Sequence, residues 1–325
     1  MKIEKIILSS IQLLQKKKND DEIFFFFVKS LLVQYLSLIK ELNEGELSLA
    51  LEEHGFWIGK TTKRRFANLI SRINVSCLNI LQLCYKGDIW QAGAMLEKFL
   101  CSDKGIKRYL VEPIINSFKT SLTSGTPLYR MRDVKIGEIP EDCWHVPFPL
   151  RRQTQNYRYS MAGLPCLYLA DSPETANLEV GKLRSGRNRW IGKFIPQKTL
   201  MYLNLEVPND DTIKCMDNAA KINFLLSFPI ILLCSVKKTK TDSFHEEYYF
   251  PQLMMYCLCL SDNEKIQRYN GIKYNSTLKK DSANYVLPAR YKGNRPPTYN
   301  YSKELLEAFK TTTPVVYSYG KSNKK

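Results

Sequence analysis

The chain has 325 residues, of which 44% are hydrophobic and 25% charged, with 48 lysines and arginines against 32 aspartates and glutamates. This composition excludes a disordered, collagen-like or low-complexity chain. The formal net charge of +16 favours an anionic partner, such as a nucleic acid, a phosphate-bearing metabolite or an acidic protein. It does not choose among them.

The first part of the chain has the pattern of packed helices. Residues 5–100 contain no proline, and apolar residues recur there at spacings of three and four, as in the stripe of Leu31, Leu32, Tyr35, Leu36 and Ile39. This spacing is typical of amphipathic helices. We therefore predict several helices, with turns near residues 18–21, 43–45 and 86–88.

After residue 109 the chain changes in character, because prolines become frequent and short runs with strand-like composition replace the helical stripes. Strands are expected at residues 127–131, 164–170, 190–195, 200–205, 230–236 and 271–274. Helices are expected between them, at residues 174–183, 218–225, 251–258 and 302–310. We predict an all-helical N-terminal domain, residues 1–115, followed by an α+β domain, residues 116–325.

Two apolar runs, residues 23–28 and 224–234, are too short for a membrane span of about 20 residues, and the second contains Pro229. Both are predicted to be core elements, so no membrane association is expected. The nine cysteines are scattered without a CxxC pair, which favours reduced thiols and a cytoplasmic protein. The three histidines, His54, His145 and His245, lack metal-ligand spacing, so we expect no metal site.

The segment from Arg158 to Val180 carries the pattern with the most chemical content. It contains an arginine, then Gly163 at an expected turn, then an apolar strand with Tyr168 near its middle. Asp171-Ser172 followed by proline predicts a helix start, and Glu179 lies in the second turn of that helix. One strand–turn–helix unit therefore presents an arginine, a tyrosine and an isolated carboxylate.

These three residue types suit an anionic nucleotide with a cleavable glycosidic bond. A guanidinium can hold a phosphate or ribose oxygen, and a tyrosine ring can stack on a base. A carboxylate can bind ribose hydroxyls and stabilise an oxocarbenium-like transition state. The same pattern also fits a structural role, in which Arg158 pairs with Glu179 and Tyr168 lies in the core.

A set of separated motifs, met in order along residues 125–315, resembles the RES domain family. The matching positions are Arg130, Arg158, Gly163, Pro165, Tyr168 and Glu179, with further matches at residues 228–231, 234–235, 247–253, 271–274 and 284–288. The RES domain is the toxin component of RES–Xre toxin–antitoxin systems. The resemblance is to a subgroup with a helical N-terminal region.

The resemblance implies an ADP-ribosyltransferase-like fold, with a mixed, mostly antiparallel β core and flanking helices. It also implies NAD as the substrate, no metal, and cleavage of the bond between nicotinamide and ribose. The residues implied in catalysis are Glu179, Arg158 and Tyr168, and those implied in NAD binding are Arg130, Tyr129 and Gly163. Arg151, next to Arg152, is a candidate for contact with the pyrophosphate because of its charge, and an exposed loop pair is the alternative for the two arginines.

Several alternatives stay open at this point. The chain has Pro251-Gln252 where many family members have a Pro-Ser pair, so the third signature residue is either Gln252 or Ser276. The acceptor of the ADP-ribosyl group is water, phosphate or a protein side chain, the last of which would make the protein an ADP-ribosyltransferase. A basic nucleic-acid-binding module with a degenerate site is the alternative from another class. Expected partners are NAD and an antitoxin or immunity protein, and a homodimer is one of the oligomeric states left open.

Overall fold

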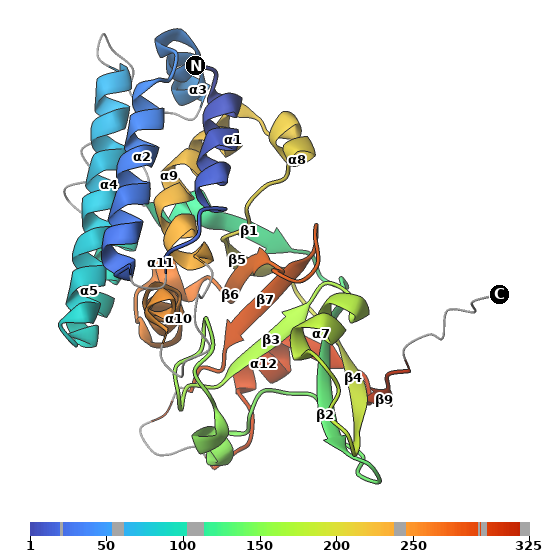
Figure 1. Ribbon diagram of the computed structural model, residues 1–325. Helices are drawn as coiled ribbons and strands as arrows, with labels where there is room; N and C mark the ends of the chain where they lie inside the picture. The colour runs from blue at the N-terminus through green and yellow to red at the C-terminus, as the bar shows by residue number, and fades with distance from the viewer. Residues whose placement is uncertain are drawn as a thin grey trace. The chain divides into compact units, whose positions relative to one another are not determined.

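The computed structural model describes residues 1–19, 22–53, 62–102, 114–236, 245–291, 293 and 298–318 (Figure 1). His54 and part of the expected turn at residues 18–21 lie outside them. Contacts divide the chain into two compact units. The helical unit comprises residues 1–119, 157–159 and 203–268, and the sheet unit comprises residues 120–156, 160–202 and 269–325.

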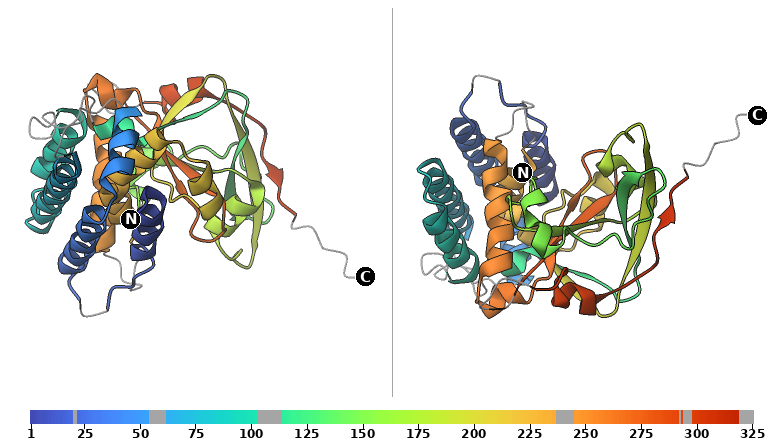
Figure 2. Two further views of the ribbon diagram at one scale, coloured as in Figure 1. Left: turned by 90° about the horizontal axis from the view of Figure 1, so that it is seen from above. Right: turned by 90° about the horizontal axis from the view of Figure 1, so that it is seen from below.

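The helical unit confirms the predicted N-terminal helices. They are α1 (Ile3–Leu13), α2 (Phe24–Lys40), α3 (Glu44–Glu53), α4 (Thr62–Tyr85) and α5 (Ile89–Ser102). Helices α2 and α4 pack along one another, as do α4 and α5 (Figure 2). Later segments add η1 (Ile114–Phe118), α8 (Asp210–Cys215), α9 (Asn218–Ser235), η3 (Glu246–Tyr248), α10 (Tyr249–Leu260) and α11 (Glu264–Gln267).

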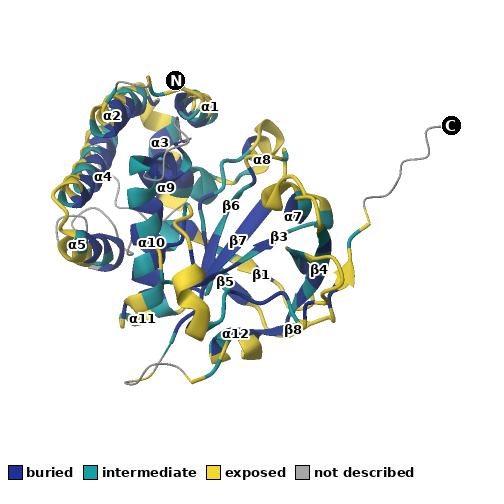
Figure 3. Cartoon of the chain, turned by 60° about the horizontal axis from the view of Figure 1, so that its bottom comes forward, coloured by how far each residue is buried: buried dark blue, intermediate teal, exposed yellow. Residues whose placement is uncertain are grey.

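Helix α9 lies at the centre of the helical unit, where it contacts α1, α3, α4 and α10. The prediction of a strand at residues 230–236 is wrong, because the chain stays helical through Pro229 to Ser235. Every residue from Phe224 to Cys234 is buried, so apolar side chains are needed all round the helix and no amphipathic stripe appears in the sequence (Figure 3). Among the described residues, α9 alone is long and apolar enough to span a membrane, and 67% of its 18-residue window is buried inside the structure.

A side chain from α2 compensates for the proline inside α9. Pro229 has no N–H, so the carbonyl oxygen of Leu225, four residues earlier, lacks its usual helical donor. The hydroxyl of Tyr35 donates to that oxygen at 2.6 Å. Both groups are fully buried, where an unpaired carbonyl would be costly. The Tyr35 hydroxyl thus supplies the Leu225 carbonyl with a donor in place of the missing N–H of Pro229.

The sheet unit is built around a mostly antiparallel sheet. Its strands are β1 (Lys119–Leu122), β2 (Leu128–Lys135), β3 (Cys166–Ala170), β4 (Arg187–Pro196), β5 (Leu200–Asn204), β6 (Gly271–Asn275), β7 (Ala283–Pro288), β8 (Phe309–Thr311) and β9 (Val315–Val316). Their order is β1-β5-β6-β7-β3-β2-β4-β8, with β9 paired to β4. Every pairing with a described register is antiparallel. The sheet also carries η2 (Phe148–Gln153), α7 (Pro173–Val180) and α12 (Lys303–Ala308).

One face of the central strands forms the main core of the sheet unit. Leu128 of β2, Leu167 and Leu169 of β3, and Leu287 of β7 belong to it, together with Phe194 of β4. Successive strand residues point to opposite faces, so the alternate residues of these strands lie on the other face. That second face holds a smaller cluster in which Met131 and Ala170 pack with Ala176 of α7. Helix α7 therefore covers the second face of the sheet.

The α+β class and the order of helices before sheet are thus confirmed, but the division of the folded chain does not coincide with the predicted boundary at residues 115/116. Residues 203–268, within the predicted second domain, belong to the helical unit. The reason is the apolar surface of α9, which needs the N-terminal helices on several sides to be buried.

Candidate functional site

Helix α7 begins where the sequence predicts it. The side-chain oxygen of Ser172 accepts a hydrogen bond from the backbone N–H of Thr175 at 3.2 Å, and Pro173 occupies the first helical position. The helix ends at Val180, three residues before the predicted end, because Gly181 turns the chain with a φ of 80°. Glu179 therefore lies in the last turn of α7.

The register of three neighbouring strands brings polar residues to the face that α7 covers. Tyr129 of β2 is opposite Ala170 of β3, and Ala170 is opposite Asn284 of β7. Residues that are directly opposite in an antiparallel pair have side chains on the same face. Tyr129, Ala170 and Asn284 therefore form one row beneath α7, and Tyr168 lies two residues along β3, on the same face.

The carboxylate of Glu179 is held by two donors from the sheet side. Its Oε1 accepts a hydrogen bond from Ser276 Oγ at 2.8 Å and another from Asn284 Nδ2 at 2.6 Å. Among the described residues, Oε2 has no hydrogen-bond partner, and Glu179 is exposed to solvent. One oxygen is therefore fixed while the other faces the solvent.

The two donors are themselves buried and held in place. Ser276 is 9% exposed and Asn284 is 4% exposed. Ser276 Oγ also accepts hydrogen bonds from the backbone N–H groups of Leu278 and Lys279, at 3.1 and 3.2 Å. The Glu179 carboxylate is thus bound to groups with little freedom to move, which is the arrangement expected of a preorganised site.

Sequence reasoning did not identify Asn284 as a site residue, although residues 284–288 were among the matching motifs. A usable signal exists in β7, where all six residues are buried and Asn284 has the one side-chain amide, in a run that is apolar except for the Tyr285 hydroxyl. A buried amide needs partners. Glu179 is that partner.

Tyr168 is half-buried, and its hydroxyl lies 2.7 Å from the hydroxyl of the buried Ser160. This contact fixes the end of the ring. Arg130 lies on β2 next to Tyr129, so strand alternation places it on the opposite face from Tyr129. Its Nη1 donates to the backbone oxygen of Tyr168 at 3.3 Å. Tyr129 and Tyr168 therefore share the α7 face, and Arg130 does not.

The remaining sequence-based candidates in the sheet unit are Gly163 and Arg151. Gly163 has a φ of 82°, which confirms the predicted turn, and a Cβ built there would have no atom within 4 Å. The glycine is thus required by backbone conformation. Arg151 is exposed in the last turn of η2. Its contact with a pyrophosphate stays a prediction.

Two further candidates belong to the helical unit. Arg158 donates through Nη1 to the backbone oxygens of Cys234 and Val236, at 2.6 and 3.1 Å. Cys234 lies in the last turn of α9 and Val236 directly follows the helix, so Arg158 acts as a cationic cap at that helix end. Gln252 lies in the first turn of α10 and donates to the backbone oxygen of Tyr157 at 2.9 Å. Helix α10 thus confirms the helix predicted at residues 251–258.

His145 is buried and both of its ring nitrogens are hydrogen-bonded to the backbone, so it has a structural role. It is 1% exposed, its Nδ1 donates to the backbone oxygen of Val146 at 2.7 Å, and its Nε2 accepts from the N–H of Ser302 at 3.1 Å. Burial lowers the pKa of this imidazole to about 4, so it is neutral near pH 7. Among the described residues, no group of three or more His, Cys, Asp or Glu side chains is arranged to hold a metal ion.

Comparison with known proteins agrees with the family resemblance of the sequence motifs. A curated protein of Bacillus subtilis (strain 168) named "Putative toxin YopC" is 23% identical over 203 residues, which is 57% of this chain and 44% of the relative. The chain thus spans less than half of that relative's length. No solved structure has a significant match. The family model of the RES domain matches residues 127–298, more than half of the chain, and the chain therefore belongs to the RES domain family.

Proposed function

We propose that this protein consumes NAD by breaking the bond between nicotinamide and ribose. With water as acceptor, NAD⁺ and H₂O give nicotinamide, ADP-ribose and a proton. With phosphate as acceptor, the phosphate oxygen forms the new bond to the ribose carbon and ADP-ribose 1″-phosphate results. The RES domain family is associated with NAD-acting enzymes, which supports this class of substrate.

The observation that carries the proposal is the state of the Glu179 carboxylate. Two buried donors fix its Oε1, while the residue itself is exposed. A carboxylate held in this way can accept hydrogen bonds from ribose hydroxyls through Oε2. Its negative charge can stabilise the positive charge that develops on the ribose as nicotinamide leaves.

The neighbouring residues suit the other parts of such a substrate. Tyr168 offers a ring whose hydroxyl is already held by Ser160, so ring stacking would cost little ordering. Tyr129 lies on the same face. We propose that Ser276, and not Gln252, acts as the third signature residue of the family, because Ser276 binds Glu179 directly. Arg151 remains a proposed ligand of the phosphates. The same role is still proposed for Arg130 and Arg158, although Arg130 lies on the other face of β2 and Arg158 binds the backbone at the end of α9.

We further propose that NAD loss makes the protein toxic to the cell in which it is made, and that an antitoxin or immunity protein restrains it. The name of the Bacillus subtilis relative and the family membership support this role. We also propose that the protein acts in the cytoplasm. The seven buried free cysteines, together with the exposed Cys215 and the partly exposed Cys259, fit a reduced compartment.

The test is incubation of the purified protein with NAD, with and without phosphate, followed by identification of the products. Glu179→Gln is the matched control, because the glutamine oxygen can still accept from Ser276 and Asn284 while the charge is lost. We expect NAD cleavage to fall about 10²–10³-fold in this variant with unchanged thermal unfolding. Parental rates in Glu179→Gln would show that the glutamate is structural.

The same experiment separates the acceptors. Free ADP-ribose indicates water, and its 1″-phosphate indicates phosphate. Labelled ADP-ribose attached to a protein band indicates a protein ADP-ribosyltransferase. Intact NAD with folded protein would refute the proposal, and a strongly salt-dependent affinity for RNA or DNA would then favour a nucleic-acid-binding module.

A further inference from the structure

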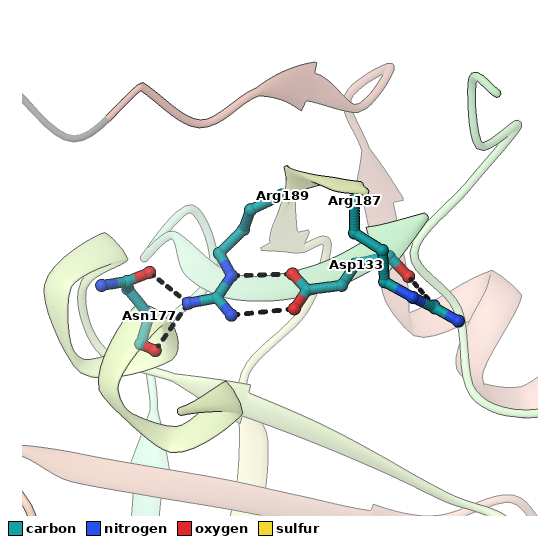
Figure 4. A network of polar contacts seen from close by, with 4 residues as sticks. All are labelled: Asp133, Asn177, Arg187 and Arg189. Atoms are coloured by element: carbon teal, nitrogen blue, oxygen red, sulfur yellow. Dashed lines mark hydrogen bonds and ion pairs between the residues drawn. The ribbon is translucent and has the colours of Figure 1, made fainter. Parts of the chain in front are cut away.

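An ion pair between the buried Arg189 and the partly buried Asp133 links the sheet to helix α7, on the side of the helix away from Glu179. Arg189 of β4 is 5% exposed and binds Asp133 of β2 through two bonds, Nε to Oδ1 at 2.7 Å and Nη2 to Oδ2 at 2.8 Å. Its remaining nitrogen, Nη1, donates to Asn177 of α7, to Oδ1 at 2.6 Å and to the backbone oxygen at 3.2 Å (Figure 4). The guanidinium thus joins two strands and the helix.

The two bonds to Asn177 engage the last turn of α7, which also carries Glu179. Residues two apart on an α-helix are separated by roughly 200° of rotation, because each turn has 3.6 residues. Asn177 and Glu179 therefore leave the helix on nearly opposite sides. Arg189 holds one side, while Ser276 and Asn284 hold the other. Rotation of α7 about its own axis is restrained from both directions.

The chemistry of the pair fits this role. The planar guanidinium matches the carboxylate of Asp133 with two parallel bonds, which leaves the third nitrogen pointing in a defined direction. Asp133 and Arg189 are partners in the register of β2 and β4. The direction of Nη1 is therefore set by the sheet. Through this nitrogen the position of α7 is fixed relative to strands β2 and β4.

We propose that Arg189, oriented by Asp133, is a positioning residue that sets the rotation of α7 through Asn177 and so places the carboxylate of Glu179. This inference rests on the proposed function of Glu179 in NAD cleavage. A displacement of a reacting group by about 1 Å can cost up to about 10²-fold in rate, so a small rotation of an eight-residue helix is sufficient to matter.

Asn177→Ala is the primary test variant. It removes the shorter of the two bonds between Arg189 and α7, keeps the pair of Arg189 with Asp133, and introduces the residue with the highest helix propensity. Arg189→Lys is the second variant. It keeps the positive charge but loses the planar guanidinium that binds Asp133 and Asn177 at the same time. Arg187→Met is the matched control, since Arg187 lies two residues away on β4 and donates to the backbone oxygen of the same Asp133 at 3.1 Å, with no described contact to α7.

We expect Asn177→Ala to lower kcat for NAD cleavage about 10-fold, with KM changed by less than about 2-fold. Arg187→Met should match the parent in both constants. In a Glu179→Gln background the Asn177→Ala effect should disappear, because the loss acts through the carboxylate. A full 10-fold further loss in the double variant would overturn the proposal, as would parental kcat in Asn177→Ala.

A second readout does not depend on NAD. Amide hydrogen exchange of residues 178–181, measured in the absence of NAD, should be faster in Asn177→Ala and Arg189→Lys than in the parent and in Arg187→Met. If the parent leaves NAD intact, the proposed function fails while this readout still tests the restraint on α7. Unchanged exchange in both variants would overturn the restraint itself.

Discussion

At the scale of single residues, the Glu179 carboxylate depends on two donors from distant parts of the chain. Ser276 and Asn284 both bind Oε1, and neither is close to Glu179 in sequence. Charge-assisted hydrogen bonds of this kind contribute about 1.5–3 kcal/mol each. The geometry of the carboxylate is therefore sensitive to either donor.

Replacement of Ser276 by alanine tests which residue takes the place of the family serine. We expect Ser276→Ala to lower NAD cleavage about 10-fold or more, because Glu179 loses a donor of roughly 1.5–3 kcal/mol. Gln252→Ala, the matched variant, should retain the parental rate, since Gln252 binds the backbone oxygen of Tyr157. Initial rates of NAD loss for the two variants decide the point. A larger loss in Gln252→Ala would reverse the assignment.

His145 makes the free energy of unfolding depend on pH. Its pKa is about 4 in the folded protein against an ordinary value of 6.5, so the unfolded chain takes up a proton first as the pH falls. The contribution of neutral His145 to the free energy of unfolding is fully present above pH 6.5. It is lost as the pH falls from 6.5 to about 4. The shift corresponds to about 3 kcal/mol.

We expect His145→Gln to flatten this pH dependence, because glutamine can accept from the Ser302 N–H but cannot be protonated. The measurement is urea unfolding of parent and variant at pH 7, 6 and 5. The difference between their unfolding free energies should shrink as the pH falls. A constant difference would show that His145 does not titrate in the unfolding reaction.

At the scale of elements, α9 and α2 are joined by the bond from Tyr35 to the Leu225 carbonyl. Tyr35→Phe leaves that carbonyl buried without a donor, so we expect a loss of about 1–3 kcal/mol in the free energy of unfolding. Pro229→Ala restores an N–H that can donate to Leu225. In the Pro229→Ala background, Tyr35→Phe should therefore cost less, by about 1 kcal/mol.

Urea unfolding of the four proteins in this cycle measures the coupling. Additive effects of the two substitutions would mean that Tyr35 does not compensate for the proline. In that case side-chain packing, and not the Tyr35 hydrogen bond, would keep α9 continuous past Pro229.

At the scale of the whole molecule, the RES family match and the compact units divide the chain differently. The match covers residues 127–298, while residues 203–268 belong to the helical unit. A fragment of residues 116–325 contains every sequence-based candidate for the site but lacks α1, α3 and α4, against which α9 is buried. Its α9 would expose a large apolar surface.

We therefore expect the fragment 116–325 to aggregate or to unfold without cooperativity, although it carries all the site candidates. The full chain, prepared in parallel, serves as the control. Size-exclusion chromatography and near-UV circular dichroism distinguish the outcomes. A monomeric fragment with a cooperative transition would show that the N-terminal helices are dispensable for folding.

The sequence alone determined the features that depend on local interactions. The start of α7 at Ser172 and Pro173, the turn at Gly163 and the strand around Tyr168 follow from caps, backbone conformation and residue pattern. Family motifs then pointed to Glu179. These features involve residues a few positions apart, so a short window of sequence contains the information.

Only the tertiary structure decided which residues meet. It brought Ser276 and Asn284 to Glu179, and it kept residues 230–235 helical through Pro229. It also joined the Gln252 amide to the Tyr157 carbonyl and placed Arg189 beside α7. Each of these depends on partners that are distant in the chain, such as Tyr35 for Leu225, which lies 190 positions away. Local propensity is weak compared with the cost of burying an unpaired polar group, so long-range contacts prevail where the two disagree.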